Sequence, residues 1–99
     1  MRLNVPSIHP GEILREEFLT PLKMTPHALA MELKVPAPRI NDIVRERRAI
    51  TPDTALRLAR YFGSTPQFWM NLQTSYDLKC AEQEIGPKIA REVHARLAA

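Results

Sequence analysis

Three features that this sequence lacks limit the structures and functions it can have: paired cysteines, long apolar runs and glycine-rich loops. Cys80 is the only cysteine among the 99 residues, so no disulfide can form within the chain, and we interpret it as a small buried apolar residue. No apolar run approaches the ~20 residues of a membrane helix, and no basic–apolar–small leader is present. We therefore expect a cytoplasmic protein that makes no contact with membranes.

Motifs for catalysis and for metal binding are also missing. The chain has three glycines, and they form neither a phosphate-binding loop nor a nucleophile motif. The three histidines, His9, His27 and His94, share no metal-ligand spacing with Cys80, and we interpret them as surface or helix-end residues. The sequence thus predicts a protein that is not an enzyme and that needs no cofactor or metal.

Positive charge is concentrated in one part of the chain. The formal net charge is +3, and basic and acidic residues balance in residues 1–34 and again in residues 65–99. Residues 35–64 hold six arginines and three acidic residues, so the whole excess lies in this middle segment. Arginine suits bidentate contacts with phosphate and guanine.

Prolines, unlike glycines, are abundant, and they mark the starts of helices. Three Thr-Pro pairs, at Thr25, Thr51 and Thr65, each precede a helical pattern. Threonine can cap the free amides of a first turn, and proline at the first helical position gives up only an N–H that has no partner. Gly63 and Gly86 are expected to end helices.

These signals predict an all-α fold without strands or repeats. We expect helices near residues 12–19 (ending before Pro21), 26–33, 37–45 and 51–62, a fifth that starts at Thr65, and a last one over about 87–97. The expected organisation is an N-terminal arm (1–8), a helix-turn-helix domain (9–78) and a C-terminal helical extension (79–99).

The second and third helices have the short lengths and short connection of a DNA-binding helix-turn-helix. In the third helix Ile40, Ile43 and Val44 fall on one face. The opposite face carries an amide and a guanidinium one turn apart, which is the chemistry that reads base edges. Taken alone, such a face is usually only solvated; the local charge and the helix pair favour DNA binding.

The expected DNA contacts divide by chemistry. Asn41 can bond adenine and Arg45 can bond guanine or a phosphate, whereas Asp42 can accept from cytosine or hold Arg39 or Arg45 in position. Arginines in the following loop are expected to meet phosphates. The full set is Thr25, Pro38, Arg39, Asn41, Asp42, Arg45, Arg47 and Arg48.

A second group of side chains has two possible roles. Phe68, Trp69, Leu72 and Tyr76 follow one another at helical spacing and belong either to the core or to a dimer interface. The stripe of Ile89, Val93 and Leu97 raises the same question. A two-fold dimer would place its two reading helices about 34 Å apart, one turn of DNA.

Several motifs taken together resemble the HigA-type antitoxins, a family within the lambda-repressor-like (XRE) class of helix-turn-helix proteins. The resemblance covers about residues 6–78, and the motifs that carry it are Pro10–Leu19, Val35-Pro36 with Arg39-Ile40-Asn41, Ile50–Gly63, Pro66–Gln73 and Tyr76-Asp77-Leu78. It implies a five-helix DNA-binding domain with an added C-terminal helix. It also implies an antidote to a partner toxin that cleaves mRNA, and a homodimer that represses its own operon on a palindrome.

The chain departs from the family at three places. Pro26 and His27 replace a Thr-Gln pair, Pro36, Ala37 and Pro38 replace polar residues, and Glu46 stands near the position of a glycine. We therefore expect the third helix to run on or to close with a different turn. Two alternatives remain: a stand-alone regulator without a toxin, and a protein-interaction module that keeps the helix-turn-helix as a scaffold.

Overall fold

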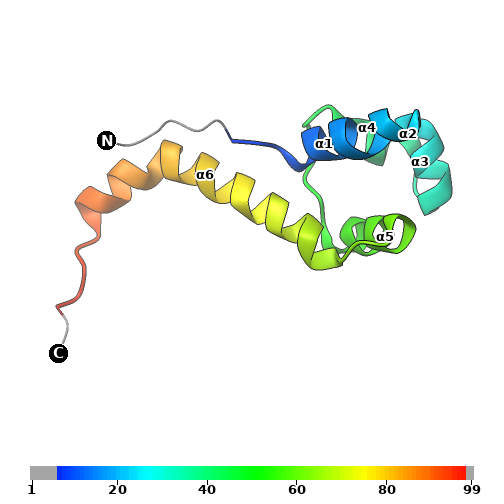
Figure 1. The fold of residues 1–99 in the computed structure, drawn as a ribbon. Helices are drawn as coiled ribbons and strands as arrows, with labels where there is room; N and C mark the ends of the chain where they lie inside the picture. The colour runs from blue at the N-terminus through cyan, green and yellow to red at the C-terminus, as the bar shows by residue number, and fades with distance from the viewer. Residues whose placement is uncertain (1–6, 98–99) are drawn as a thin grey trace.

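The computed structural model describes residues 7–97 and consists of helices joined by short turns (Figure 1). The all-α prediction is confirmed. Of the expected arm, residues 1–6 lie outside the described part. The elements are α1 (Pro10–Ile13), the π-helical segment η1 (Leu14–Leu19), α2 (Thr20–Leu22), α3 (Pro26–Leu33), α4 (Ala37–Val44), α5 (Pro52–Phe62) and α6 (Pro66–Glu92).

The Thr-Pro pairs do begin helices. The hydroxyl of Thr25 accepts from the Ala28 N–H at 3.0 Å, and that of Thr65 accepts from the Phe68 N–H at 3.1 Å. Thr51 stands at the same position before α5 but makes no side-chain cap bond. Threonine and proline therefore fix three helix starts in the same way, and two of them gain a hydrogen bond from it.

Four helix ends close with one backbone residue in the left-handed region. Gly63 has φ 72°, as expected of a helix-ending glycine, but Lys23, Lys34 and Glu46 adopt φ values of 53°, 60° and 63°. After Glu46 the Arg47 N–H returns to the Asp42 carbonyl at 2.8 Å, which satisfies a free end of α4. Of the two outcomes expected at this helix end, α4 does not run on. It stops at Val44, and Glu46 adopts the left-handed conformation that a glycine usually takes at such a position.

The first helical segment is longer than expected. It begins at Pro10 and continues as η1 and α2 to Leu22, so the helix does not break before Pro21. Proline removes one backbone donor, and in a π-helical turn the backbone hydrogen bonds span five residues instead of four. Here the Thr20 N–H reaches the Arg15 carbonyl, and the Thr20 hydroxyl donates to the same oxygen at 2.9 Å.

The expected break at Gly86 and the separate last helix are wrong. One helix, α6, runs from Pro66 through Gly86 and Pro87 to Glu92, and the boundary expected between residues 78 and 79 falls inside it. Gly86 is not in the left-handed region, and the helix continues through Pro87 although an interior proline removes a backbone donor and crowds the preceding turn. The distal half of α6 projects away from the remaining helices (Figure 1).

The core lies between the first helical segment, α3, α4, α5 and the start of α6. Its largest fully buried side chains include Leu14, Leu29, Ile40, Leu58 and Trp69. Trp69 is 0% exposed and its indole N–H donates to Ser64 at 3.0 Å. For Trp69 the core interpretation is therefore correct, and the dimer-interface interpretation is wrong.

Candidate nucleic-acid interface

The helix-turn-helix consists of α3, a three-residue connection over residues 34–36, and α4. Val35 is buried after the turn, and its N–H reaches the Ala30 carbonyl at 3.1 Å. α4 then packs against α3 and α1, with Ile40, Ile43 and Val44 buried. This leaves the opposite side of α4 facing solvent, as the sequence predicts.

Two residues of the first segment hold the C-terminal end of α4. The backbone of Gly11 lies so close to the Ile43 carbonyl that a Cβ at residue 11 would overlap its oxygen. Arg15 donates to the Val44 carbonyl and lies 3.5 Å from the Glu46 carboxylate. A cation at a helix C-terminus interacts favourably with the free carbonyls, so Arg15 positions α4, a role that spacing alone did not reveal.

The solvent side of α4 presents the residues proposed to read bases. Pro38 and Arg45 are exposed, and Asn41 and Asp42 are half-buried. Asn41 lies in α4 and Arg45 is the residue that caps its C-terminus, four residues later, which is the arrangement that two neighbouring base pairs require.

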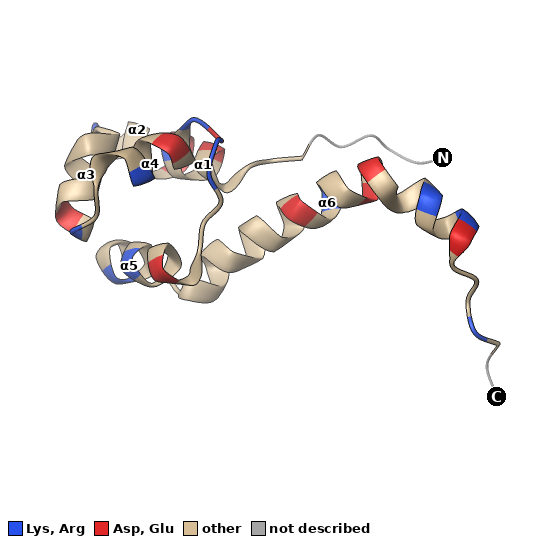
Figure 2. Ribbon diagram, turned by 180° about the vertical axis from the view of Figure 1, so that it is seen from behind, with Lys and Arg blue, Asp and Glu red and all other residues tan. Residues whose placement is uncertain are grey.

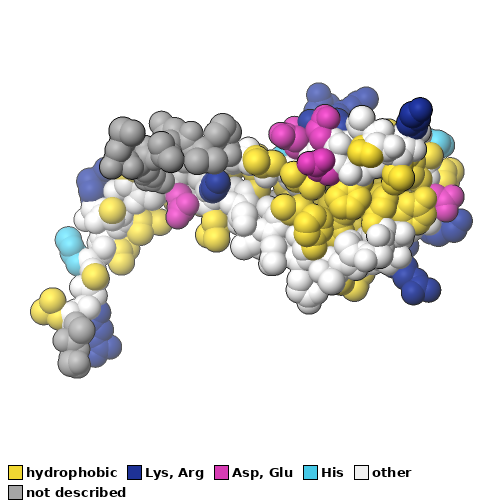
Figure 3. Space-filling view, in the orientation of Figure 1, with side chains coloured by type: hydrophobic (Ala, Val, Ile, Leu, Met, Phe, Trp, Pro, Cys, Tyr) yellow, Lys and Arg dark blue, Asp and Glu magenta, His cyan; other side chains and the backbone are white. Residues whose placement is uncertain are grey.

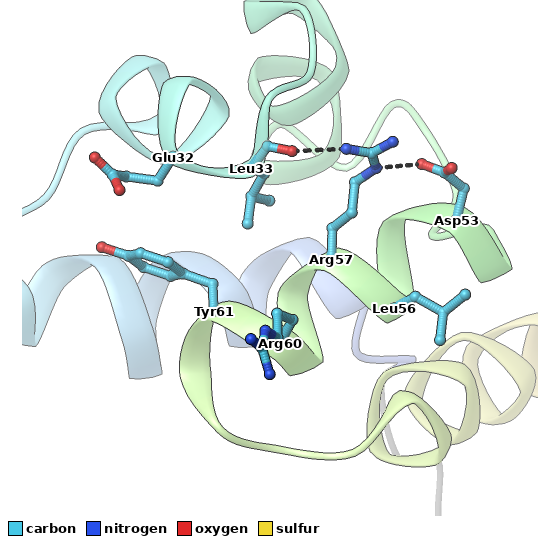
Figure 4. A pocket seen from close by; sticks show the side chains of 7 residues that line it. All are labelled: Glu32, Leu33, Asp53, Leu56, Arg57, Arg60 and Tyr61. Carbon is cyan, nitrogen blue, oxygen red and sulfur yellow. Dashed lines mark hydrogen bonds and ion pairs between the residues drawn. The ribbon is translucent and has the colours of Figure 1, made fainter.

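Arg39 occupies a different position from the one its motif suggested. Its guanidinium pairs with Asp53 at 2.7 Å, and Asp53 also accepts from Arg57 at 2.9 Å. Arg57 in turn donates to the Leu33 carbonyl at 2.9 Å, so the group connects α3, α4 and α5 (Figure 4). Hydrogen bonds from Arg57 and Arg39 hold the pKa of Asp53 below its usual range. Arg39 can still turn to DNA, but only by leaving this pair.

The remaining charged residues fall into paired and unpaired groups. Asp42 lies 3.7 Å from Arg48; of the two roles expected for it, contact with cytosine or holding Arg39 or Arg45, the second is not seen, because its partner is Arg48. Within residues 7–97 neither Arg45 nor Arg47 takes part in an ion pair, and both are exposed. These two arginines are therefore the ones most ready to meet phosphates or base edges. Figure 2 marks in blue the Lys and Arg positions along the ribbon of the DNA-binding domain.

The hydroxyl group of Thr25, at the start of α3, can still donate a hydrogen bond. Its oxygen already accepts from the Ala28 N–H, but a hydroxyl can donate at the same time. A threonine at a helix N-terminus can thus add a bond to a phosphate oxygen.

His9 is a helix-end residue, as expected, but it is buried rather than at the surface. Its Nδ1 accepts from the Gly11 N–H at 2.8 Å and its ring lies edge-on to Tyr76 at 4.8 Å. Burial lowers the pKa of His9, although Glu46 and Asp77 act in the opposite direction. His27 and His94 are exposed.

The rest of the chain offers no metal or membrane feature in its described part. Cys80 is only half-buried, and a hydrogen bond with its thiol raises the pKa of Tyr76. No group of three His, Cys, Asp or Glu side chains within residues 7–97 could hold a metal ion. No helix in that range has both the length and the apolar character needed to cross a membrane.

Comparison with known proteins agrees with this geometry. A helix-turn-helix family model matches residues 14–69. Virulence-associated protein I of Dichelobacter nodosus is 64% identical over 81% of this chain and 74% of its own length.

Two solved structures are similar to this chain in both fold and sequence. The Pseudomonas aeruginosa antitoxin HigA with the higBA promoter is 53% identical, with a TM-score of 0.92, over 93% of this chain and 100% of that chain. Antitoxin GraA in complex with its operator is 45% identical, with a TM-score of 0.90, over 99% of both chains. The chain therefore belongs to the helix-turn-helix family and, within it, to the HigA-type antitoxins.

Proposed function

We propose that this chain is the antitoxin of a two-protein module: it binds operator DNA through α4 as a homodimer, represses its own operon and neutralises a toxin that cleaves mRNA. The observation that carries the DNA-binding part is the solvent face of α4, where Asn41 and Arg45 stand one turn apart beside the unpaired Arg47. The similarity to structures named as antitoxin–promoter and antitoxin–operator complexes supports it.

The mechanism is binding in two layers. Arg47 and Arg48, in the loop after α4, meet phosphates and give affinity that does not depend on sequence. Asn41 and Arg45 meet base edges and give preference for one sequence. The Arg39–Asp53–Arg57 group keeps α4 at a fixed angle to α5 while these contacts form.

The dimer in this proposal forms through α6. Leu78, Ile85 and Ile89 are 58%, 45% and 46% exposed, and helical spacing places them within about 40° of one another. The core-facing residues Trp69 and Gln73 lie on the other side of the helix. An unpartnered apolar stripe on a projecting helix is typical of an interface between copies. Leu72 packs against the core and Tyr76 against His9, so neither is needed for it.

Binding to the chain's own promoter tests the DNA-binding part. Arg47→Ala should weaken binding to all DNA about equally and flatten the salt dependence, whereas Asn41→Ala should relax the preference at one base pair. A shift assay that finds no binding to this promoter at low salt would refute the repressor proposal.

Co-expression with the product of the adjacent open reading frame tests the antitoxin part. We expect that product to arrest growth when expressed alone, and growth to recover when this chain is co-expressed. If the neighbour has no effect on growth while promoter binding is intact, the chain is a stand-alone regulator instead.

A further inference from the structure

An apolar surface remains exposed on the part of the protein that α4 does not occupy. It is formed by Phe18 of η1, Leu22 of α2, Tyr61 and Phe62 of α5, and Phe68 of α6, and we call it the aromatic face. Figure 3 shows hydrophobic side chains gathered over the helices of the DNA-binding domain. Leu22, Tyr61 and Phe68 are 58%, 42% and 39% exposed.

The aromatic face is pre-formed by ring packing. The Phe18 ring lies 4.8 Å from Phe62 and 6.2 Å from Phe68, and the Tyr61 ring lies 5.0 Å from Phe62. The Tyr61 hydroxyl also contacts the Met24 sulfur at 3.9 Å. Rigid aromatic side chains lose little conformational entropy on binding, which is why they serve as anchors in interfaces.

A groove of about 590 Å³ continues from the aromatic face between α3 and α5. Tyr61 borders both surfaces, and Figure 4 shows it across the groove from Glu32, with Arg60 and Leu56 on the same helix. Leu56 is 59% exposed. The groove is of mixed character: Leu33, Leu56 and Tyr61 line it together with four charged residues, Glu32, Asp53, Arg57 and Arg60.

The aromatic face is separate from the surfaces that the proposed function uses. α4 packs against α3 and α1, and it lies behind α1 in the view of Figure 1. The stripe of Leu78, Ile85 and Ile89 lies on the distal half of α6. A partner on the aromatic face can therefore bind while DNA and a second copy are also bound.

Charge at the edge of the aromatic face indicates the kind of partner. Glu12, Glu16 and Glu17 lie along α1 and η1, and acidic side chains border the apolar area in Figure 3. Glu16 pairs with Arg15 at 2.9 Å, so Glu12 and Glu17 are the carboxylates of this edge that a partner can use. A protein that cleaves RNA must present basic surface to the phosphates of its substrate, and such a surface complements this acidic edge. A second copy of this chain carries the same acidic edge and gains no such complementarity.

We propose that the aromatic face is the surface on which the basic, RNA-cleaving toxin docks. The proposal rests on the proposed function, and it adds the location of the contact. Leu22 and Tyr61 are its central contacts, and Glu17 attracts the toxin from the edge.

The test compares two leucines of equal exposure. Leu22 and Leu78 are each 58% exposed, one on the aromatic face and the other on the α6 stripe. The affinity of each variant for the purified product of the adjacent open reading frame is measured by calorimetry, with promoter binding, circular dichroism and oligomeric state recorded in parallel.

We expect Leu22→Glu to weaken toxin binding at least ten-fold and to leave dimerisation and promoter binding unchanged. Leu78→Glu should do the reverse: toxin binding stays within two-fold of the wild type while the dimer dissociates. Tyr61→Ala provides a second variant of the face, with a loss of the same size, in case Leu22→Glu alters the fold. Glu17→Gln should slow association and reduce its dependence on salt.

Three results would overturn the proposal. Wild-type affinity in both Leu22→Glu and Tyr61→Ala would place the toxin elsewhere and leave the antitoxin function standing. An equal loss of toxin binding in Leu78→Glu would place the contact on the dimer or on α6. If the wild-type chain itself does not bind the neighbouring protein, both the docking surface and the antitoxin function fail.

Discussion

Replacing Gly11 with alanine should damage both the fold and DNA binding, because α1 meets the end of α4 at this residue. A Cβ built at residue 11 would lie 1.7 Å from the Ile43 carbonyl oxygen and 2.7 Å from its carbon. Both atoms belong to the backbone and cannot rotate away. The Cβ would also come within 3.1 Å of the His9 Nδ1 that caps α1. Either α1 or the last turn of α4 must move.

The cost can be bounded from the contact. Overpacking a core typically costs 1–3 kcal/mol, and here the obstacle is rigid, so we expect about 3 kcal/mol or more. A domain of this size has a total stability of roughly 5–15 kcal/mol. The melting temperature should fall by about 12–24 °C, at 4–8 °C per kcal/mol. Promoter affinity should also fall at temperatures where the variant is folded, since α4 is displaced.

The other two glycines serve as matched controls. Gly63→Ala places a side chain in open space but at φ 72°, and the strain should cost about 1 kcal/mol. Gly86→Ala lies within α6 with only the Glu82 Cβ nearby, at 3.9 Å, and should leave stability unchanged or raise it by up to about 1 kcal/mol. Thermal and denaturant unfolding of the three variants measures their relative stabilities. A Gly11→Ala variant that is as stable as Gly63→Ala would refute the close approach of α1 to α4.

Three further predictions concern single charged groups. Because burial lowers the pKa of His9 below 6.5, protonation favours the unfolded chain. Stability should therefore be independent of this group above about pH 6.5 and decline below it, and denaturant titrations should show that His9→Asn, which can still cap α1, lacks this part of the decline. Glu46→Gly relieves a non-glycine residue at φ 63° and should stabilise the protein by about 0.5–1 kcal/mol in urea unfolding; a destabilised variant would contradict the assigned helix end. Asp53→Asn removes the carboxylate that Arg39 and Arg57 share and that connects α4 to α5, so it should loosen α4 and weaken promoter binding in a shift assay; promoter binding at wild-type strength would show that this group does not position α4.

Local signals in the sequence were sufficient to locate α3, α4 and α5. Thr25 and Thr51 mark two of their starts, Gly63 marks an end, and the apolar positions Ile40, Ile43 and Val44 fall on the buried face. Each of these signals acts within one turn of helix, where capping and periodicity decide the outcome. The solvent face of α4 with Asn41 and Arg45 follows from the same periodicity.

Features that depend on contacts between distant residues could not be predicted in the same way. The burial of His9 requires Tyr76 on α6, and the role of Arg15 requires the end of α4, 29 residues further along the chain. The pairing of Arg39 with Asp53 joins two helices across the intervening loop. Gly86 and Pro87 failed as a stop signal because Gly86 does not adopt the left-handed conformation that closes a helix, so α6 continues through Pro87 even though proline disfavours a helix interior.

Protection of guanine N7 from methylation across the chain's own promoter tests the central claim most directly, because N7 faces only the major groove. If α4 enters that groove in each half of a dimer, two protected patches should appear about 10 base pairs apart. Protection in both patches should disappear together in the Leu78→Glu variant, which cannot form the dimer. A single patch in the wild type, or protein bound to the promoter without any major-groove protection, would contradict the account.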